Sequence, residues 1–396
     1  FRDGPYDQDY HPDAVTLWTK FLAQRYGDLE AVSAAHGARY PSWDDVRPPE
    51  RFRGRAPKDS PLYLDWARFQ EHLLEHALGR MRRRMARAGM KGVPVVHNLP
   101  LGDGGQAATV PRLQEVVDLV GFDYYHPARE HRTIKRRTLY LAGSHPMPYA
   151  PEMGVGAPPW FTPLTHEDSL YCTMAACAYG LRGFNLYMLV DRDRWYGSPI
   201  DARGTPRVEA GAWKQLLQRL EETEFHELER EVEVALVVPR EYARLSRVTH
   251  TLGLVSPATL EAIGGTPVDG CREDDLGFGG PVQVLWWRML AKTADALTAA
   301  GIPYVYVDSE APASRLEGKR LVVAPSYEFV DAERWDRLRK AADDGATVVY
   351  GPAMPTMDVG MRERRFEPPE GGRRVLLDEP EDATALVEEI AEEIGL

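Results

Sequence analysis

The chain has 396 residues, of which 43% are hydrophobic, and its 48 basic and 60 acidic side chains give a formal charge of −12. No apolar run approaches the ~20 residues that a membrane-spanning helix needs, and three cysteines without paired spacing exclude a disulfide scaffold and a four-cysteine zinc site. The length suggests about two domains, and the acidic balance argues against a nucleic-acid partner. We therefore expect a folded protein with neither a membrane nor a nucleic acid as partner.

The N-terminal part of the chain favours helices. Residues 11–26 carry apolar side chains at helical spacing, with Pro12 in the first turn and a glycine after the last. A short helix over 28–36 and an irregular, proline- and arginine-rich excursion follow. The longest helix of this half is expected over 62–88, where apolar residues recur every three or four positions.

Four short apolar stretches follow, and each changes abruptly to polar and aromatic residues at its C-terminal end. These expected strands lie within residues 93–98, 116–127, 146–154 and 183–197. Helices are expected between or after them, at about 107–116, 128–137, 166–180 and 208–223. Such alternation indicates a parallel sheet with helical crossovers, and polar residues at strand ends are typical of a (β/α)₈ active site. Four strands make half of such a barrel.

Near residue 230 a second strand–helix alternation begins. A strand over 232–239 precedes a glycine-rich segment, 250–281, and a helix over 282–300. Further strands are expected over 303–308, 320–325 and 346–352, with a helix over 331–343 and a closing amphipathic helix. We therefore divide the chain into residues 1–230 and a doubly wound α/β domain, 231–396.

Glu152 is the leading candidate for a catalytic group. It ends an expected strand in the sequence YAPEMG, where a carboxylate among aromatic side chains suits the nucleophile of a glycosidase. A structural hydrogen-bonding role is the alternative. Retaining hydrolysis also needs an acid/base carboxyl group roughly 5 Å away. Asp123, Asp191 and Asp193 are the internal candidates, and none has the Asn-Glu setting expected of that group.

Other residues near the strand ends suit sugar binding, because sugars present apolar faces and fixed hydroxyls to aromatic rings and polar side chains. They are His97, Asn98, Tyr124, Tyr125 and Trp160. Taken singly, each is more simply explained as part of the core or as a satisfied polar group. Their expected position at one face of the sheet favours a shared site.

One motif points to a different chemistry. His72, Glu75 and His76 match the H-x-x-E-H pattern of zinc peptidases, which makes a zinc hydrolase a further alternative. The helix that carries them is rich in arginine and is expected on the outside of the barrel. Short motifs often match by chance, so we expect neither a metal nor another cofactor.

The order of these pieces resembles glycoside hydrolase family 42, the β-galactosidases, and more loosely family 35. The resemblance is carried by LWTKFLAQRYGDLEAVSAAHGARYPSWDDVRPP, LDWARFQ, VPVVHN, DLVGFDYYHP and the Glu152 strand. It implies that Glu152 is the nucleophile on barrel strand seven and that Tyr125 hydrogen-bonds it. Trp160 would line the galactose pocket.

The resemblance also has departures. Where the family has a Glu-x-x-His pair after strand eight, this chain has Asp193-Arg194-Trp195-Tyr196, so that Asp193, Trp195 and Tyr196 are the expected sugar contacts and galactose preference is weakened. The acid/base glutamate of the family would end strand four, just before Phe1. We therefore expect an N-terminally truncated chain holding the C-terminal half of a (β/α)₈ TIM barrel, strands five to eight. A flavodoxin-like or amidotransferase-like α/β domain follows, which in the family mediates trimer formation.

The function expected from these features is that of a retaining, exo-acting glycoside hydrolase. Its substrate would be an oligosaccharide or β-galactoside with a terminal β-linked sugar. The chain alone is expected to be inactive, since the acid/base half lies outside it, and the intact protein to be cytoplasmic and trimeric. The alternative from another class is a non-catalytic carbohydrate-binding or assembly subunit, which needs no acid/base group.

Overall fold

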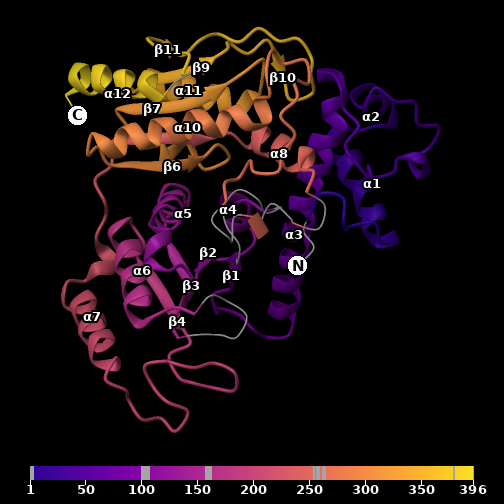
Figure 1. The fold of residues 1–396 in the computed structure, drawn as a ribbon. Helices are drawn as coiled ribbons and strands as arrows, with labels where there is room; N and C mark the ends of the chain where they lie inside the picture. Colours follow the sequence, from indigo (N-terminus) through magenta and orange to yellow (C-terminus); the bar gives the residue numbers. More distant parts are fainter. Residues whose placement is uncertain are drawn as a thin grey trace.

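The structure is a computed structural model in which the described residues form two larger parallel β-sheets, with helices packed on both, and one short two-stranded pair (Figure 1). It describes residues 4–99, 108–156, 163–252, 255, 259–260, 265–377 and 380–395. None of the helices in these ranges is both long and apolar enough to cross a membrane.

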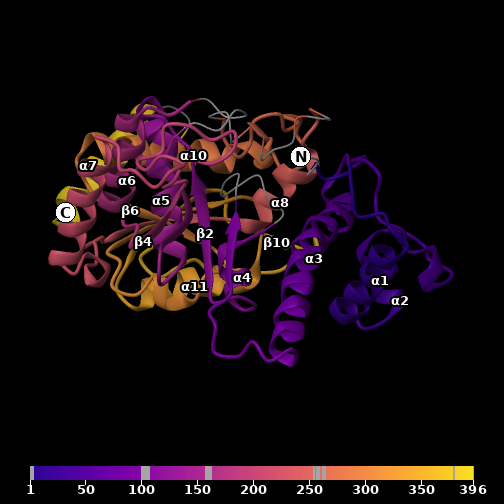
Figure 2. The same ribbon diagram turned by 90° about the horizontal axis from the view of Figure 1, so that it is seen from below.

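The N-terminal helices form the first part of the molecule. They are α1 (Pro12–Tyr26), α2 (Leu29–Ala35) and α3 (Ser60–Arg87), with the short 3₁₀ helices η1 (Trp43–Asp45) and η2 (Pro57–Asp59) between them. Trp18 of α1 meets Trp66 of α3 edge-on, with ring centroids 5.7 Å apart, and both side chains are fully buried. Figure 2 shows α3 between the two shorter helices and the rest of the molecule. The three helices predicted here are confirmed.

The first sheet has four parallel strands in the order of the chain. They are β1 (Val96–Leu99), β2 (Leu119–Tyr124), β3 (Tyr149–Gly154) and β4 (Gly183–Tyr187). Their connections and the following segment contain α4 (Val110–Gln114), η3 (Ala128–Glu130), α5 (His131–Ser144), α6 (His166–Ala178) and α7 (Ala210–Glu222). The predicted strand–helix alternation is confirmed, and the arrangement is TIM-barrel-like. Among the described residues, β1 and β4 are the two edges, and Val96 of β1 is 44% exposed.

A bulge between β2 and β3 sets the register of the residues at their C-terminal ends. Gly121 pairs with Tyr149, whereas Asp123 pairs with Glu152, so β3 gains one residue over this interval. A Cβ on Gly121 would lie 2.0 Å from the Tyr149 carbonyl oxygen. A glycine is therefore required where the strands approach, and the bulge turns Glu152 toward Asp123.

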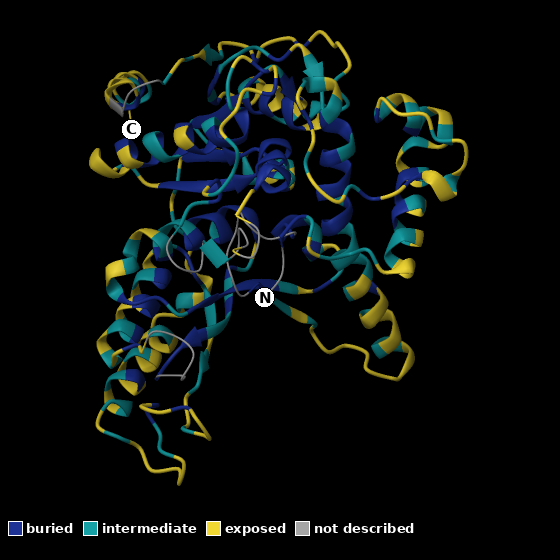
Figure 3. Ribbon diagram, turned by 45° about the vertical axis from the view of Figure 1, so that its right-hand side comes forward, coloured by how far each residue is buried: buried dark blue, intermediate teal, exposed yellow. Residues whose placement is uncertain are grey.

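The second sheet has five parallel strands. Their spatial order is β11 (Arg373–Arg374), β9 (Thr347–Pro352), β7 (Leu321–Ser326), β5 (Val234–Val238) and β6 (Tyr304–Asp308). The central strands are buried (dark blue in Figure 3), as expected for a parallel sheet covered on both faces. The helices are α8 (Arg240–Thr249), α10 (Val282–Ala299), α11 (Ala332–Asp343) and α12 (Pro380–Ile394), with η4 (Phe225–Glu227) before β5 and η5 (Ala313–Arg315) after β6.

Several elements of this part were not predicted. They are α8, the short pair β8 (Phe329–Val330) and β10 (Met357–Asp358), and the edge strand β11. Helix α8 is rich in charged residues that are nevertheless buried, including Arg240, Glu241 and Arg247. Tyr242, Leu245 and Val248 recur at helical spacing and are fully buried, so the apolar stripe typical of a helix is present among these charged residues.

A buried ion pair in the second sheet region is hydrogen-bonded to helix α5 of the first. Arg240 of α8 donates from Nε to the Asp308 carboxylate at 2.5 Å, and Tyr140 of α5 donates to the same oxygen at 2.6 Å. Ser144 of α5 accepts a hydrogen bond from the Asp308 backbone N–H. Arg240 and Asp308 are each at most 3% exposed. Helix α5, which covers the first sheet, is thus fixed to the end of β6.

We expect Asp308→Ala to destabilise the chain by about 3–5 kcal/mol, because it leaves the Arg240 guanidinium buried without its counter-ion. Asp344→Ala is the matched control, since it removes a carboxylate whose pair with Lys340 is exposed, and should cost less than about 1 kcal/mol. Urea denaturation of both variants measures the difference. Equal losses in the two variants would contradict a special role for the buried pair.

Candidate active site

Three polar side chains from neighbouring strands meet at the C-terminal edge of the first sheet. Asn98 of β1 donates from its side-chain amide to Asp123 Oδ2 at 2.9 Å and to Glu152 Oε1 at 3.5 Å. Asp123 and Glu152 stand opposite each other in the β2–β3 register. Because all three strands are parallel, their C-terminal ends lie on one side, and one amide bridges two carboxyl groups there.

The second oxygen of Glu152 is held by Tyr125, which directly follows β2. The Tyr125 hydroxyl donates to Glu152 Oε2 at 2.5 Å. A Cβ on Gly154 would lie 2.5 Å from the Tyr125 ring, so the glycine after Met153 makes room for the tyrosine. Glu152 itself is half-buried. Each of its oxygens thus accepts a hydrogen bond, which holds the carboxylate in a defined orientation.

The surroundings of the Asp123 carboxyl group favour its protonated form. Burial, together with the nearby charge of Glu152, raises the pKa of Asp123 to about 7, although the Asn98 hydrogen bond and Arg137 act in the opposite direction. Asp123 is only 3% exposed, and its Oδ1 has no hydrogen-bond partner among the described residues. Burial and the Glu152 hydrogen bond also raise the pKa of Tyr125, which therefore stays a donor.

Aromatic side chains form one wall beside Tyr125. The Trp195 ring lies edge-on to Tyr125 and to Tyr187, with centroids 6.4 and 5.1 Å apart. Its indole N–H donates to the Val155 carbonyl at 2.8 Å, and the side chain is buried. Trp195 thus fixes the position of the tyrosine that holds Glu152.

The other predicted sugar contacts do not all lie close to Glu152. His97 lies on β1 next to Asn98 and is half-buried, and burial lowers its pKa. Asp193 and Tyr196 are exposed, and no contact joins them to Glu152 in the part of the chain that the structure describes. Trp160 lies outside the described residues.

The strand expected within residues 183–197 is confirmed but occupies only the first part of this range. Strand β4 ends at Tyr187, and Asp193 lies in the loop beyond it, where a turn pairs Arg192 with Trp195. Arg194 adopts a left-handed backbone conformation in this turn, with φ of 63°. The turn directs Trp195 inward and leaves its neighbours exposed, which the sequence pattern did not indicate.

The surroundings of Asp123, Asp191 and Asp193 do not suit the role of the acid/base group. Asp191 accepts hydrogen bonds from the Arg207 guanidinium at 2.5 Å and from the Ser198 backbone N–H at 2.8 Å, and these bonds lower its pKa. Asp123 is buried beside Glu152, and Asp193 is exposed. A general acid has to reach the leaving oxygen of a substrate while it holds a proton, and none of the three combines both properties.

The H-x-x-E-H motif lies on one turn of α3. Its Glu75 carboxylate accepts hydrogen bonds from Arg68 at 3.0 Å and from Arg112 at 2.8 Å. These cations compete with a metal for the carboxylate. Burial acts to raise the pKa of Glu75, but His72 and Arg68 outweigh it and lower that pKa. Within the described ranges, no group of three or more histidine, cysteine, aspartate or glutamate side chains is arranged to hold a metal ion.

Residues 3–161 match the family model of glycoside hydrolase family 42, described as Beta-galactosidase. The resemblance to family 42 is confirmed. The match includes α3, β1, β2 and β3, and therefore the strands that carry Asn98, Asp123 and Glu152.

Solved structures agree in fold. The β-galactosidase from Bacillus circulans sp. alkalophilus has a TM-score of 0.66 at 18% identity, over 89% of this chain and 51% of that one. A family 42 exo-carrageenase from Bacteroides ovatus has a TM-score of 0.64 at 12% identity, over 96% and 51%. A curated β-1,2-glucosyltransferase of Ignavibacterium album is 20% identical over 88% of this chain and 51% of its own length. The chain thus spans about half the length of the relatives it matches.

We expect the buried Asp123 carboxyl group to make stability fall as pH rises. Its folded pKa of about 7 lies above the unfolded value near 3.9, so the folded state binds more protons between these limits and loses stability as pH rises through that window. Asp123→Asn should therefore gain about 1–3 kcal/mol relative to the native chain between pH 5 and pH 8.

Denaturation by urea at both pH values measures this difference, and the exposed Asp344→Asn serves as control. A parallel pH dependence of the native chain and Asp123→Asn would show that Asp123 is ionised throughout.

Proposed function

We propose that this chain supplies the nucleophile half of a retaining, exo-acting glycoside hydrolase that releases a terminal β-linked sugar, with galactose as the first candidate. In this proposal β1 to β4 are strands five to eight of a (β/α)₈ barrel, and residues 231–396 are a separate α/β domain. The family 42 match supports the reaction class, and the order of the four strands supports their place in the barrel.

One observation carries the proposal. The Glu152 carboxylate stands at the C-terminal end of a parallel strand, half-buried, with one oxygen held by Tyr125 and the other by Asn98. A glycosidase nucleophile has to be ionised and fixed in direction while it attacks the anomeric carbon. Asp123 supports this state: with a pKa of about 7 it can keep its proton, which limits the negative charge beside Glu152.

The acid/base carboxyl group is assigned to a segment outside this chain. The three internal aspartates are respectively buried, paired with an arginine and exposed, which supports an external source. The attack by Glu152 then requires protonation of the leaving oxygen by that group, and hydrolysis of the glycosyl-enzyme requires the same group as base. We expect the isolated chain to lack turnover of substrates with poor leaving groups.

A second candidate is glycosyl transfer. The relative named as a β-1,2-glucosyltransferase aligns with most of this chain, and a covalent glycosyl-enzyme can pass its sugar to a hydroxyl group as well as to water. The loop from Asp193 to Tyr196 departs from the family pattern expected for galactose. Glucose is therefore the competing sugar in this proposal. The trimeric assembly and the cytoplasmic location of the intact protein stay predictions.

Covalent labelling tests the nucleophile directly. We expect 2,4-dinitrophenyl 2-deoxy-2-fluoro-β-galactoside to attach one fluorosugar to Glu152, because dinitrophenolate leaves without help from an acid and the fluorine slows release of the sugar. Peptide mass spectrometry locates the adduct. The matched gluco reagent decides between the two sugars by the faster labelling rate.

Glu152→Gln is the matched control and should remain unlabelled, whereas Glu222→Gln, in α7 where the carboxylate and its partner Arg219 are both exposed, should label like the native chain. An adduct on another carboxylate would overturn the assignment of Glu152. Absence of any adduct, with galactose binding retained, would favour the non-catalytic carbohydrate-binding alternative.

A further inference from the structure

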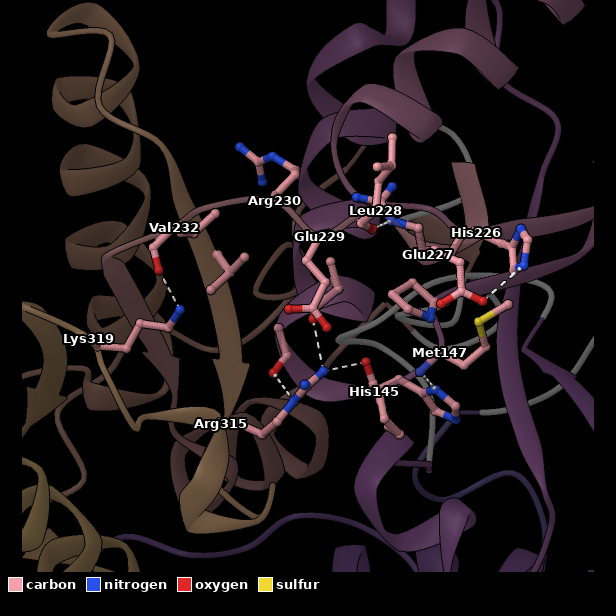
Figure 4. Close-up of a pocket in the computed structure, with 17 residues that line it drawn as sticks. His145, Met147, His226, Glu227, Leu228, Glu229, Arg230, Val232, Arg315 and Lys319 are labelled. Atoms are coloured by element: carbon pink, nitrogen blue, oxygen red, sulfur yellow. Dashed lines mark hydrogen bonds and ion pairs between the residues drawn. The ribbon is translucent and has the colours of Figure 1, made fainter. Parts of the chain in front are cut away.

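A cavity of about 310 Å³ lies between the two sheet regions, away from Glu152 (Figure 4). Its walls come from the segments just before β3 and β4, from the connection 226–232, and from residues 305–319 around β6 and η5. Since the segments before β3 and β4 lie where those strands begin, the cavity is at the opposite end of the first sheet from the candidate active site.

Four cationic side chains line this cavity: Arg182, Arg230, Arg315 and Lys319. The hydrogen bonds found for three of them go to backbone carbonyl oxygens. Arg315 donates to Gly143, Ala142 and His145, Lys319 donates to Val232, and Arg182 donates to Leu181, Cys177 and Leu228. Carbonyl oxygens satisfy donors but carry no full negative charge that would neutralise the cations. Burial lowers the pKa of all four cations, and neighbouring cations lower the pKa of Arg230 and of Lys319 further.

Two buried donors at the cavity have no partner among the described residues. One is Nη1 of Arg230, and the other is Nε2 of His145. His145 is 2% exposed, and its Nδ1 accepts a hydrogen bond from the Met147 backbone N–H at 2.9 Å. Nε2 therefore carries the proton of the neutral ring. Buried donors without acceptors are rare in native proteins, and they indicate an acceptor that is absent from the protein itself.

The charge of the lining is also unbalanced. Glu227 and Glu229 are its carboxylates, and both are exposed, whereas the four cations are partly buried. Glu229 attracts Arg182 and Arg315, but with histidine counted as neutral two positive charges remain in excess. A phosphate monoester carries about −1.5 to −2 charges at pH 7 and three acceptor oxygens, and guanidinium groups bind such oxygens in pairs.

We propose that this cavity binds a small phosphorylated molecule, with the phosphate between Arg230, Arg315, Lys319 and His145. The volume favours an ester over free phosphate, because small-molecule sites begin near 300 Å³ and the cavity reaches about 310 Å³. The ligand would contact both sheet regions at once. Its binding would therefore stabilise their relative placement, at a distance from the catalytic edge.

Isothermal titration calorimetry on the full 396-residue chain tests this site with glucose 6-phosphate, inorganic phosphate and glucose as probes. We expect saturable binding of glucose 6-phosphate, binding of inorganic phosphate at least about threefold weaker, and no competition by glucose for the site of the ester. Arg230→Gln should weaken binding of the ester by about tenfold or more. Lys319→Gln is the second variant if Arg230→Gln does not fold.

The control Arg365→Gln removes an equal charge from an exposed position paired with Glu367 and should leave the affinity unchanged. Glu152→Gln should also bind the ester normally, which separates this cavity from the candidate active site. Failure of glucose 6-phosphate to bind, or equal weakening in Arg365→Gln, would overturn the proposal. Tighter binding of inorganic phosphate than of the ester would overturn the assignment of an organic ligand.

Discussion

The parallel pairing of β1, β2 and β3 is the constraint on which the candidate active site depends. Parallel strands end on one side, so residues separated by more than fifty positions, Asn98 and Glu152, come within hydrogen-bonding distance. The bulge after Gly121 then brings Glu152 opposite Asp123. If neighbouring strands ran antiparallel, their C-terminal ends would lie at opposite edges of the sheet and the same residues would be far apart.

The local chemistry follows from this placement. Two carboxyl groups at one strand edge repel each other when both are charged, and burial of Asp123 resolves the conflict by raising its pKa to about 7. Glu152 then accepts hydrogen bonds from Asn98 and Tyr125 as the more exposed member of the pair. In glycosidases, too, the surroundings keep one carboxyl group protonated while a second one is ionised. Asp123, however, is too deeply buried to meet a leaving group.

The sequence was sufficient to predict the elements with clear periodicity and the position of Glu152 at a strand end. It also predicted that Asn98 and Tyr125 lie at the same edge as Glu152, because polar residues that follow parallel strands meet at one edge. The role of Asp123 beside Glu152 was not predicted, since it depends on a bulge. Helix α8 was not predicted although Tyr242, Leu245 and Val248 recur at helical spacing. Charged residues lie between them, and only tertiary contacts such as the pair of Arg240 with Asp308 reveal that these are buried as well.

The central claim is that Glu152 forms a covalent glycosyl-enzyme, and the anomeric configuration of an azide product tests it most directly. Azide needs no base, and 2,4-dinitrophenyl β-galactoside needs no acid, so both steps can proceed without the acid/base group. We predict that the chain with this substrate and azide forms β-galactosyl azide, identified by NMR, through two inversions at the anomeric carbon. Formation of the α-azide by the native chain, or of β-azide by Glu152→Gln, would contradict the account.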